Sequence, residues 1–194
     1  PPASIDAVLA PEYRGKVGYA PTNASFHAFV TALRLDRGEE GARDWLRRFK
    51  ANQPRAYESN ALVLDAVDRG EASLGLINHY YWHAKVAEEG DAVNARIHSL
   101  PAGDPGALVN VAGVGVLAGS DAEAKAREAV RFLLSDTAQQ YVADVTAEYA
   151  VVPGISSTKH DLPPLEKVGG YAVDLGDLDS LDVTLAMLDE VGLT

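Results

Sequence analysis

Two adjacent tyrosines, Tyr80 and Tyr81, belong to a polar and aromatic cluster that directly follows the apolar residues 74–77. A phenolate is a hard oxygen ligand, which suits a trivalent cation such as Fe³⁺ better than zinc or copper, and a nearby cation favours the charged form of an acid. Successive side chains of a strand point to opposite faces, so two tyrosines converge on one ion only where a turn or a helix begins. The cluster therefore allows a ferric site, and it is also compatible with one tyrosine in the core and the other on the surface.

Two histidines of the same cluster, His79 and His83, are separated by four positions. On a helix this spacing places both rings on one face, where they could bind a metal. The pair could instead cap the helix or lie at the surface without a ligand. The other histidines, His27, His98 and His160, are isolated in the sequence, and we expect structural roles for them.

Short polar residues precede two predicted helices, in positions where an anion could bind. Thr22, Asn23, Ala24 and Ser25 precede the first helix, and Asn60 lies at the start of another. The N–H groups and the positive dipole end of a helix N-terminus attract anions. The same residue types are ordinary N-caps that bind nothing further, so both interpretations stay open at this point.

Signatures of catalysis are missing from the sequence. It contains no G-x-S-x-G, H-E-x-x-H or Walker pattern, and no carboxylate pair stands out among its 28 acidic residues. The chain has no cysteine, which excludes disulfides, thiolate nucleophiles and cysteine-based metal sites. These absences favour a binding protein over an enzyme.

The composition is that of a globular protein with an acidic surface. The 194 residues are 47% hydrophobic and suffice for one large or two small domains with a core. The net charge of −11 disfavours nucleic acid and anionic membranes as partners, and no apolar run approaches the ~20 residues of a membrane span. Because the sequence begins with Pro1 rather than Met, the lack of a signal peptide says nothing about its destination.

Strands and helices are predicted to alternate in the first part of the chain, which is typical of an α/β sheet with crossover helices. The predicted strands are residues 17–20, 55–57 and 74–77, and the predicted helices are residues 25–36, 39–52, 61–69 and 82–89. Ligands of such sheets bind beyond the carboxyl ends of the strands. The loops with Ser25, Asn60 and Tyr80 are expected at that edge.

The second part of the chain is predicted to contain further strands at residues 96–98 and 107–117, and helices at residues 121–134, 136–145 and 180–191. Gly113 and Gly115 inside the second of these strands would mark a hinge or a close approach of backbone. In the helix at 121–134 the spacing predicts that Ala124, Ala129, Val130, Leu133 and Leu134 face inward.

Residues 75–83, Gly-Leu-Ile-Asn-His-Tyr-Tyr-Trp-His, resemble the tyrosine-pair motif of bacterial ferric-iron-binding proteins. These proteins are the extracytoplasmic solute-binding components of iron ABC transporters. Further similarity extends over most of the chain, at residues 15–22, at Asn60, at 104–109 and at 148–153.

The resemblance implies a periplasmic-binding-protein-like α/β fold of type II, a two-lobed Venus flytrap with the ligand in the cleft. It implies that Tyr80 and Tyr81 bind Fe(III) and that a synergistic anion, phosphate or carbonate, completes the coordination shell. The anion pocket would be lined by Thr22, Asn23, Ala24, Ser25, Asn60 and Asn78. The family loop often reads Ser-Gly-Ala where this chain has Asn23, Ala24 and Ser25, which leaves the identity of the anion open.

Family members carry an N-terminal segment upstream of the point that matches Pro1, which builds most of one lobe and in some members supplies a histidine and a glutamate ligand. We therefore expect residues 1–106 to form the ligand-bearing lobe, and residues 107–160 to form a hinge strand and helices that complete the other lobe. Residues 161–194 are expected to pack back on the first lobe as a loop and a helix. The apolar stripe of residues 121–145 would pack on the remaining lobe, a neighbouring chain or an absent fragment.

The resemblance further implies a permease partner and a periplasmic or extracytoplasmic location, with a lipid anchor as an option for the full-length protein. Three alternatives stay open. The same fold could bind an organic anion, a thiamine-like molecule or a polyamine. The chain could be a metal-dependent oxygenase that uses His79, His83 and an acid, or a sensor lobe fused to other domains.

Overall fold

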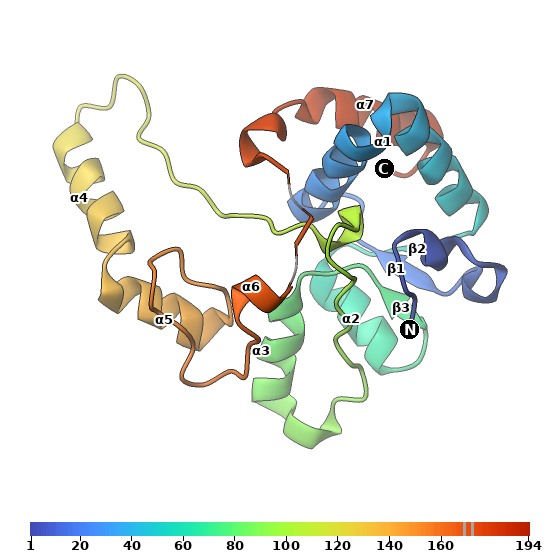
Figure 1. The fold of residues 1–194 in the computed structure, drawn as a ribbon, viewed down its shortest axis with the longest axis horizontal. Helices are drawn as coiled ribbons and strands as arrows, with labels where there is room; N and C mark the ends of the chain where they lie inside the picture. Colours follow the sequence, from blue (N-terminus) through green and yellow to red (C-terminus); the bar gives the residue numbers. More distant parts are fainter. Residues whose placement is uncertain (169, 172) are drawn as a thin grey trace. The chain divides into compact units, whose positions relative to one another are not determined.

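The computed structural model describes residues 1–168, 170–171 and 173–194 (Figure 1). These residues form two compact units, of which the first consists of Pro1–Asn110 together with Val168–Thr194 and the second of Val111–Lys167. The first unit is therefore discontinuous in sequence, because residues from the last part of the chain complete it.

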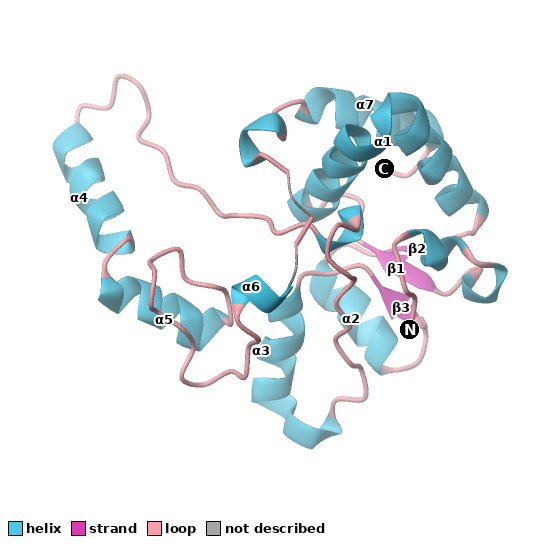
Figure 2. Cartoon of the chain, viewed as in Figure 1, coloured by secondary structure: helices cyan, strands magenta, loops and turns pink. Residues whose placement is uncertain are grey.

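A small parallel sheet lies in the first unit (magenta in Figure 2). Its strands are β1 (Val17–Tyr19), β2 (Arg55–Ala56) and β3 (Leu74–Gly75), and their order is β2-β1-β3 with both neighbours parallel to β1. Parallel strands need crossover connections, and helices supply them here. The prediction of an α/β arrangement with crossover helices is confirmed.

The first crossover is the helix α1 (Ala24–Ala51), which bends at Gly38, where φ is 69° and ψ is 170°. These dihedrals lie outside the helical region and suit only a residue without Cβ. The two arms of α1 correspond to the two helices predicted at residues 25–36 and 39–52. Both arms bury their apolar face in the main core, with side chains that are fully shielded from solvent: Val30, Leu33, Trp45, Leu46 and Phe49.

Three further helices complete the first unit: α2 (Asn60–Asp68), α3 (His79–Glu89) and α7 (Leu181–Val191). The last of them packs on α1, where the hydroxyl oxygens of Thr31 and Thr184 lie 2.7 Å apart in the interior. Arg34 Nη1 also donates to Thr184 Oγ1 at 3.1 Å. Short 3-10 turns join these elements at Asp6–Leu9, Pro11–Tyr13, Gly90–Ala92, Pro105–Ala107 and Leu175–Asp177.

Two glycines allow α2 to pack closely on the sheet. Gly18 on β1 and Gly75 on β3 are register partners, and Val63 of α2 lies over both. A Cβ on Gly75 would lie 2.7 Å from Val63 Cγ1, and one on Gly18 would lie 3.1 Å from the same atom. No side chain fits at such short distances. The lack of a Cβ at Gly18 and Gly75 therefore allows the helix and the sheet to approach this closely.

The predicted strands at residues 96–98 and 107–117 are wrong. Residues 96–98 and 109–117 are irregular, and Leu108 forms an isolated bridge to Tyr171. A Cβ at Gly113 or Gly115 would meet nothing within 4 Å, so a close backbone approach does not explain these glycines.

The second unit contains α4 (Glu123–Leu133), α5 (Asp136–Thr146) and most of the short helix α6 (Leu165–Val168). Asp144 of α5 fixes the loop that follows: its Oδ1 accepts from the Thr158 N–H at 2.6 Å and from the Ser157 hydroxyl at 3.2 Å. These hydrogen bonds lower the pKa of Asp144, and the one from the Thr158 N–H has the largest effect. No helix in the described ranges combines the length and the apolar character of a membrane span.

The inward orientation predicted for one face of α4 is also wrong within the described chain. Ala124 and Ala129 are exposed, Val130 is half-buried, and Leu133 and Leu134 are 45% and 50% exposed. The three strands of the described residues all belong to the first unit, so α4 has no sheet within its own unit to cover this face. The spacing identified the apolar face correctly, but it carries no information about a partner.

The packing of α2 on Gly75 gives a direct prediction. Gly75→Ala places a methyl group against Val63 and should lower the free energy of unfolding by about 1–3 kcal/mol, as overpacked cores do. Urea unfolding followed by circular dichroism measures this change. Gly113→Ala is the matched control, because its Cβ enters open space, and equal midpoints for the two variants would contradict the close packing.

Candidate functional site

The tyrosine pair lies in the first turn of α3. β3 ends at Gly75 and α3 begins at His79, three positions before the predicted start at residue 82. The helix start that two converging tyrosines require is therefore present. The ring centres of Tyr80 and Tyr81 are 4.7 Å apart with an interplanar angle of 34°, and both side chains are half-buried.

Contacts beyond the first turn hold α3 on the rest of the unit. Trp82 Nε1 donates to the Ala95 carbonyl at 2.9 Å, and Lys85 Nζ donates to Asp65 Oδ1 of α2 at 3.0 Å. Asp68 of α2 accepts a hydrogen bond from the Ala95 N–H at 3.0 Å, so both α3 and α2 are hydrogen-bonded to the backbone of Ala95. Hydrogen bonds to the carboxylates of Glu89 and Asp65 raise the pKa of Lys85, and the Asp68 carboxylate lies 3.8 Å from Lys85 Nζ.

Asn78 is in direct contact with the tyrosine pair. It occupies the N-cap position of α3 without making a side-chain capping bond, and its Nδ2 donates to Tyr80 Oη at 2.8 Å. This hydrogen bond fixes the phenol oxygen relative to the start of the helix. In this structure the predicted anion-binding residue Asn78 thus contacts a predicted metal ligand.

The other predicted anion residues meet at the N-termini of α1 and α2. Asn23 caps α1, because its Oδ1 accepts from the Ser25 N–H at 2.9 Å and from the Ser25 hydroxyl at 2.5 Å. Asn60, only 2% exposed, reaches across from α2 and donates to Ser25 Oγ at 3.3 Å. Thr22 and Ala24 lie in the same loop and are exposed.

All three loops lie at one edge of the sheet. β1 ends before the Thr22–Ser25 loop, β2 before Asn60 and β3 before Tyr80, and the strands are parallel, so their carboxyl ends meet. The helices that follow direct their positive ends toward this edge (Figure 1). The structure thus brings Ser25 together with Asn60, and Asn78 together with the tyrosines, as two groups of side chains.

The histidines of α3 lie beside the tyrosines. The ring centres of His79 and His83 are 6.1 Å apart, and that of His79 is 5.7 Å from Tyr80. Within the described ranges, no group of three or more histidines and acids could hold a metal ion. The histidines therefore lack the acidic third ligand that the oxygenase alternative requires there.

Lys85 and Trp82, which fasten α3, were not predicted to shape the site. His27 has the structural role expected for it, because its Nε2 lies 2.7 Å from the Pro21 carbonyl and fastens the loop before α1. Lys85 and Glu89 form an ion pair with i,i+4 spacing, which can be recognised in the sequence of a helix. The partners of His27 and Trp82 are backbone carbonyls, which leave no signal in the sequence.

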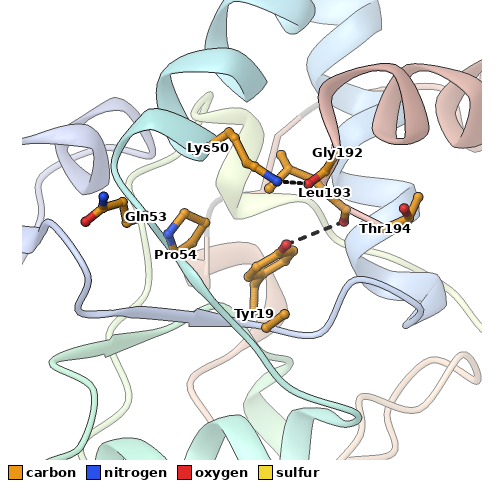
Figure 3. Close-up of a pocket in the computed structure, with 8 residues that line it drawn as sticks. Tyr19, Lys50, Gln53, Pro54, Gly192, Leu193 and Thr194 are labelled. Carbon is orange, nitrogen blue, oxygen red and sulfur yellow. Dashed lines mark hydrogen bonds between the residues drawn. The ribbon is translucent and has the colours of Figure 1, made fainter.

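A separate pocket of about 330 Å³ lies at the opposite end of α1, near the end of α7 (Figure 3). Lys50 Nζ donates to the Gly192 carbonyl, and Tyr19 Oη donates to the Leu193 carbonyl at 3.5 Å. Burial raises the pKa of Tyr19. None of the predicted site residues lines this pocket, so it is not the candidate site.

A family model described as bacterial extracellular solute-binding protein matches residues 1–168. The chain is 34% identical to the major ferric iron-binding protein of Neisseria meningitidis serogroup B over 191 residues, which are 98% of this chain and 57% of that protein. It is 33% identical to the Fe(3+)-binding periplasmic protein of Serratia marcescens, of which it covers 56%. The chain thus spans little more than half the length of these relatives.

The structure of iron-bound HitA from Pseudomonas aeruginosa is similar with a TM-score of 0.92 and 33% identity, over 100% of this chain and 62% of that one. Apo ferric ion-binding protein A of Pasteurella haemolytica has the same fold, with a TM-score of 0.86. These similarities confirm the predicted type II periplasmic-binding-protein fold and the resemblance to ferric-binding proteins. The individual site residues stay predictions.

The buried amide of Asn60 provides a test of the loop geometry. Asn60→Ala removes the donor to Ser25 Oγ from a site that solvent hardly reaches, and we expect the free energy of unfolding to fall by about 1–2 kcal/mol. Chemical denaturation measures the difference. Asn94→Ala, at an exposed position, is the control, and the prediction fails if both variants unfold at the same midpoint.

Proposed function

We infer the function from the family: the chain belongs to the bacterial extracellular solute-binding proteins. This membership confirms the prediction of a solute-binding protein rather than an enzyme. We propose that the protein binds Fe(III) outside the cytoplasm and delivers it to the permease of an ABC transporter for import. Iron would then be the transported solute of this protein.

The observation that carries the proposal is the close pair of Tyr80 and Tyr81 in the first turn of α3, with ring centres 4.7 Å apart. Two phenolates supply hard oxygen ligands and two negative charges, which offset most of the charge of Fe³⁺. The half-buried position favours this use, because a charged ligand attracts a cation more strongly where less water screens it. The relatives named above are iron-binding by name, which supports the same assignment.

A small anion, phosphate or carbonate, would complete the coordination shell. The proposed anion residues lie at the N-termini of two helices, where backbone N–H groups and the helix dipoles favour negative charge. Ser25 and Asn60 are already in contact, and Thr22, Asn23 and Ala24 belong to the same loop. Asn78 would contribute from the side of the tyrosines.

We further propose the division into lobes expected above, with residues 1–106 as the ligand-bearing lobe and 107–160 as a hinge and part of the other lobe. Residues 161–194 would return to the first lobe, and the packing of α7 on α1 supports this assignment. Closure of two lobes on the ligand would be the functional motion. The chain alone would hold part of a site and bind iron more weakly than its longer relatives.

The iron proposal predicts a colour. Adding ferric salt to the chain should give a visible tyrosinate-to-iron charge-transfer band, which Tyr80→Phe and Tyr81→Phe should each reduce strongly. Tyr141→Phe, a change at a 65% exposed tyrosine of the second unit, should leave the band unchanged. A protein that gives no band and instead binds a polyamine, a thiamine-like molecule or an organic anion would contradict the proposal.

The anion proposal predicts that phosphate strengthens iron binding. In the wild-type chain we expect the apparent iron affinity to rise with added phosphate, whereas in Ser25→Asp the rise should disappear, because a carboxylate in the loop repels the anion. Ser25→Thr keeps the hydroxyl and should keep the effect. Equal phosphate dependence in Ser25→Asp and the wild type would exclude this loop as the anion site.

A further inference from the structure

We propose that α3 carries a second metal site, in which one ring nitrogen of His79 and one of His83 bind a single borderline divalent cation such as Cu²⁺, Ni²⁺ or Zn²⁺. The site is separate in its donor atoms from the tyrosine pair, and nothing in the proposed iron function uses either imidazole.

The spacing of the two rings fits one shared ion. His79 and His83 are one turn apart on the same helix, and their ring centres are separated by 6.1 Å. A metal about 2.0–2.1 Å from a ring nitrogen lies roughly 3 Å from the ring centre, so two rings on one ion have centres roughly 5–6.5 Å apart. The observed separation falls in this interval.

The helix that carries the pair is held in place. Trp82, between the two histidines, donates a hydrogen bond to the Ala95 carbonyl, and Lys85 donates one to Asp65 of α2. Each imidazole also meets an aromatic ring edge to face: His79 meets Tyr80 at 73°, and His83 meets Trp82 at 81°. Two ligands on a fixed turn lose little conformational freedom when they bind an ion.

The donor atoms select a different metal class from that of the tyrosines. Imidazole nitrogen suits Cu²⁺, Ni²⁺ and Zn²⁺, whereas hard oxygen donors suit small, highly charged ions. Water would complete the shell, because the described residues contain no third histidine or acid grouped with the pair. Where a ligating nitrogen makes a hydrogen bond, that bond would be exchanged for the bond to the metal. The net charge of −11 attracts cations to the chain in general.

Copper provides the sharpest test, because its electron paramagnetic resonance spectrum reports the number of bound nitrogens. The chain is titrated with Cu²⁺ by calorimetry, and the spectrum is recorded at one equivalent. We expect one tight equivalent with two imidazole nitrogens. His79→Gln and His83→Gln should each weaken binding at least tenfold, because each leaves a single imidazole, and the double variant should show no tight equivalent at this site.

One control separates this site from others in the chain. His160→Gln alters a histidine of the second unit and should keep the copper affinity within about twofold of the wild type. Circular dichroism of each variant checks that α3 is still formed. Because the probe is copper alone, failure of the iron proposal leaves this result unaffected.

The proposal is overturned if the wild-type spectrum shows fewer than two imidazole nitrogens, a result that does not depend on the folding of any variant. It is also overturned if either glutamine variant binds copper as tightly as the wild type. Loss of the tight equivalent in His160→Gln would assign the copper to the second unit instead.

Discussion

The parallel pairing of β1 with both β2 and β3 is the constraint on which the candidate site depends. The strands are only two or three residues long, yet their common direction brings the ends of all three to one edge. The loops that bear Ser25, Asn60 and Tyr80 follow these ends directly. The absence of Cβ atoms at Gly18 and Gly75 is part of the same constraint, because it lets α2 pack against the sheet and places Asn60 within reach of Ser25.

The first turn of α3 carries the proposed ligand side chains, and other residues of the helix hold it to the rest of the unit. Its first residues carry phenol and imidazole groups, and Lys85 and Trp82 hold the helix to α2 and to the Ala95 backbone. This division has a physical reason, because side chains that bind a ligand cannot also be fully occupied in holding their own helix. A rigid support next to the ligand-binding turn keeps the ligand atoms in place without using them.

Much of this arrangement could be predicted from the sequence, because it depends on local patterns. The helices of the first unit follow apolar spacing and N-cap residues, and the tyrosine pair is recognisable from residue types alone. The predicted start of α3 at residue 82 is too late: Asn78 at the N-cap is a residue type that signals a helix start, but His79, Tyr80 and Tyr81 have low helix propensity. The strand predicted at 107–117 is wrong for a different reason: regular pairing is a property of two segments, and the sequence of one segment cannot show whether another will pair with it along its length. The exposed Leu133 at the end of α4 and Leu134 directly after it show the same limit for helices.

The packing of α7 on α1 has a consequence for the timing of folding. The core of the first unit contains Met187 and Leu188 together with Val17 and Trp45, and Thr31 meets Thr184 across a separation of 153 positions. A ribosome that has translated this sequence only as far as residue 100 has therefore not yet produced side chains that this core requires. Contacts so distant in sequence form slowly. The first unit can complete its fold only after α7 has been synthesised.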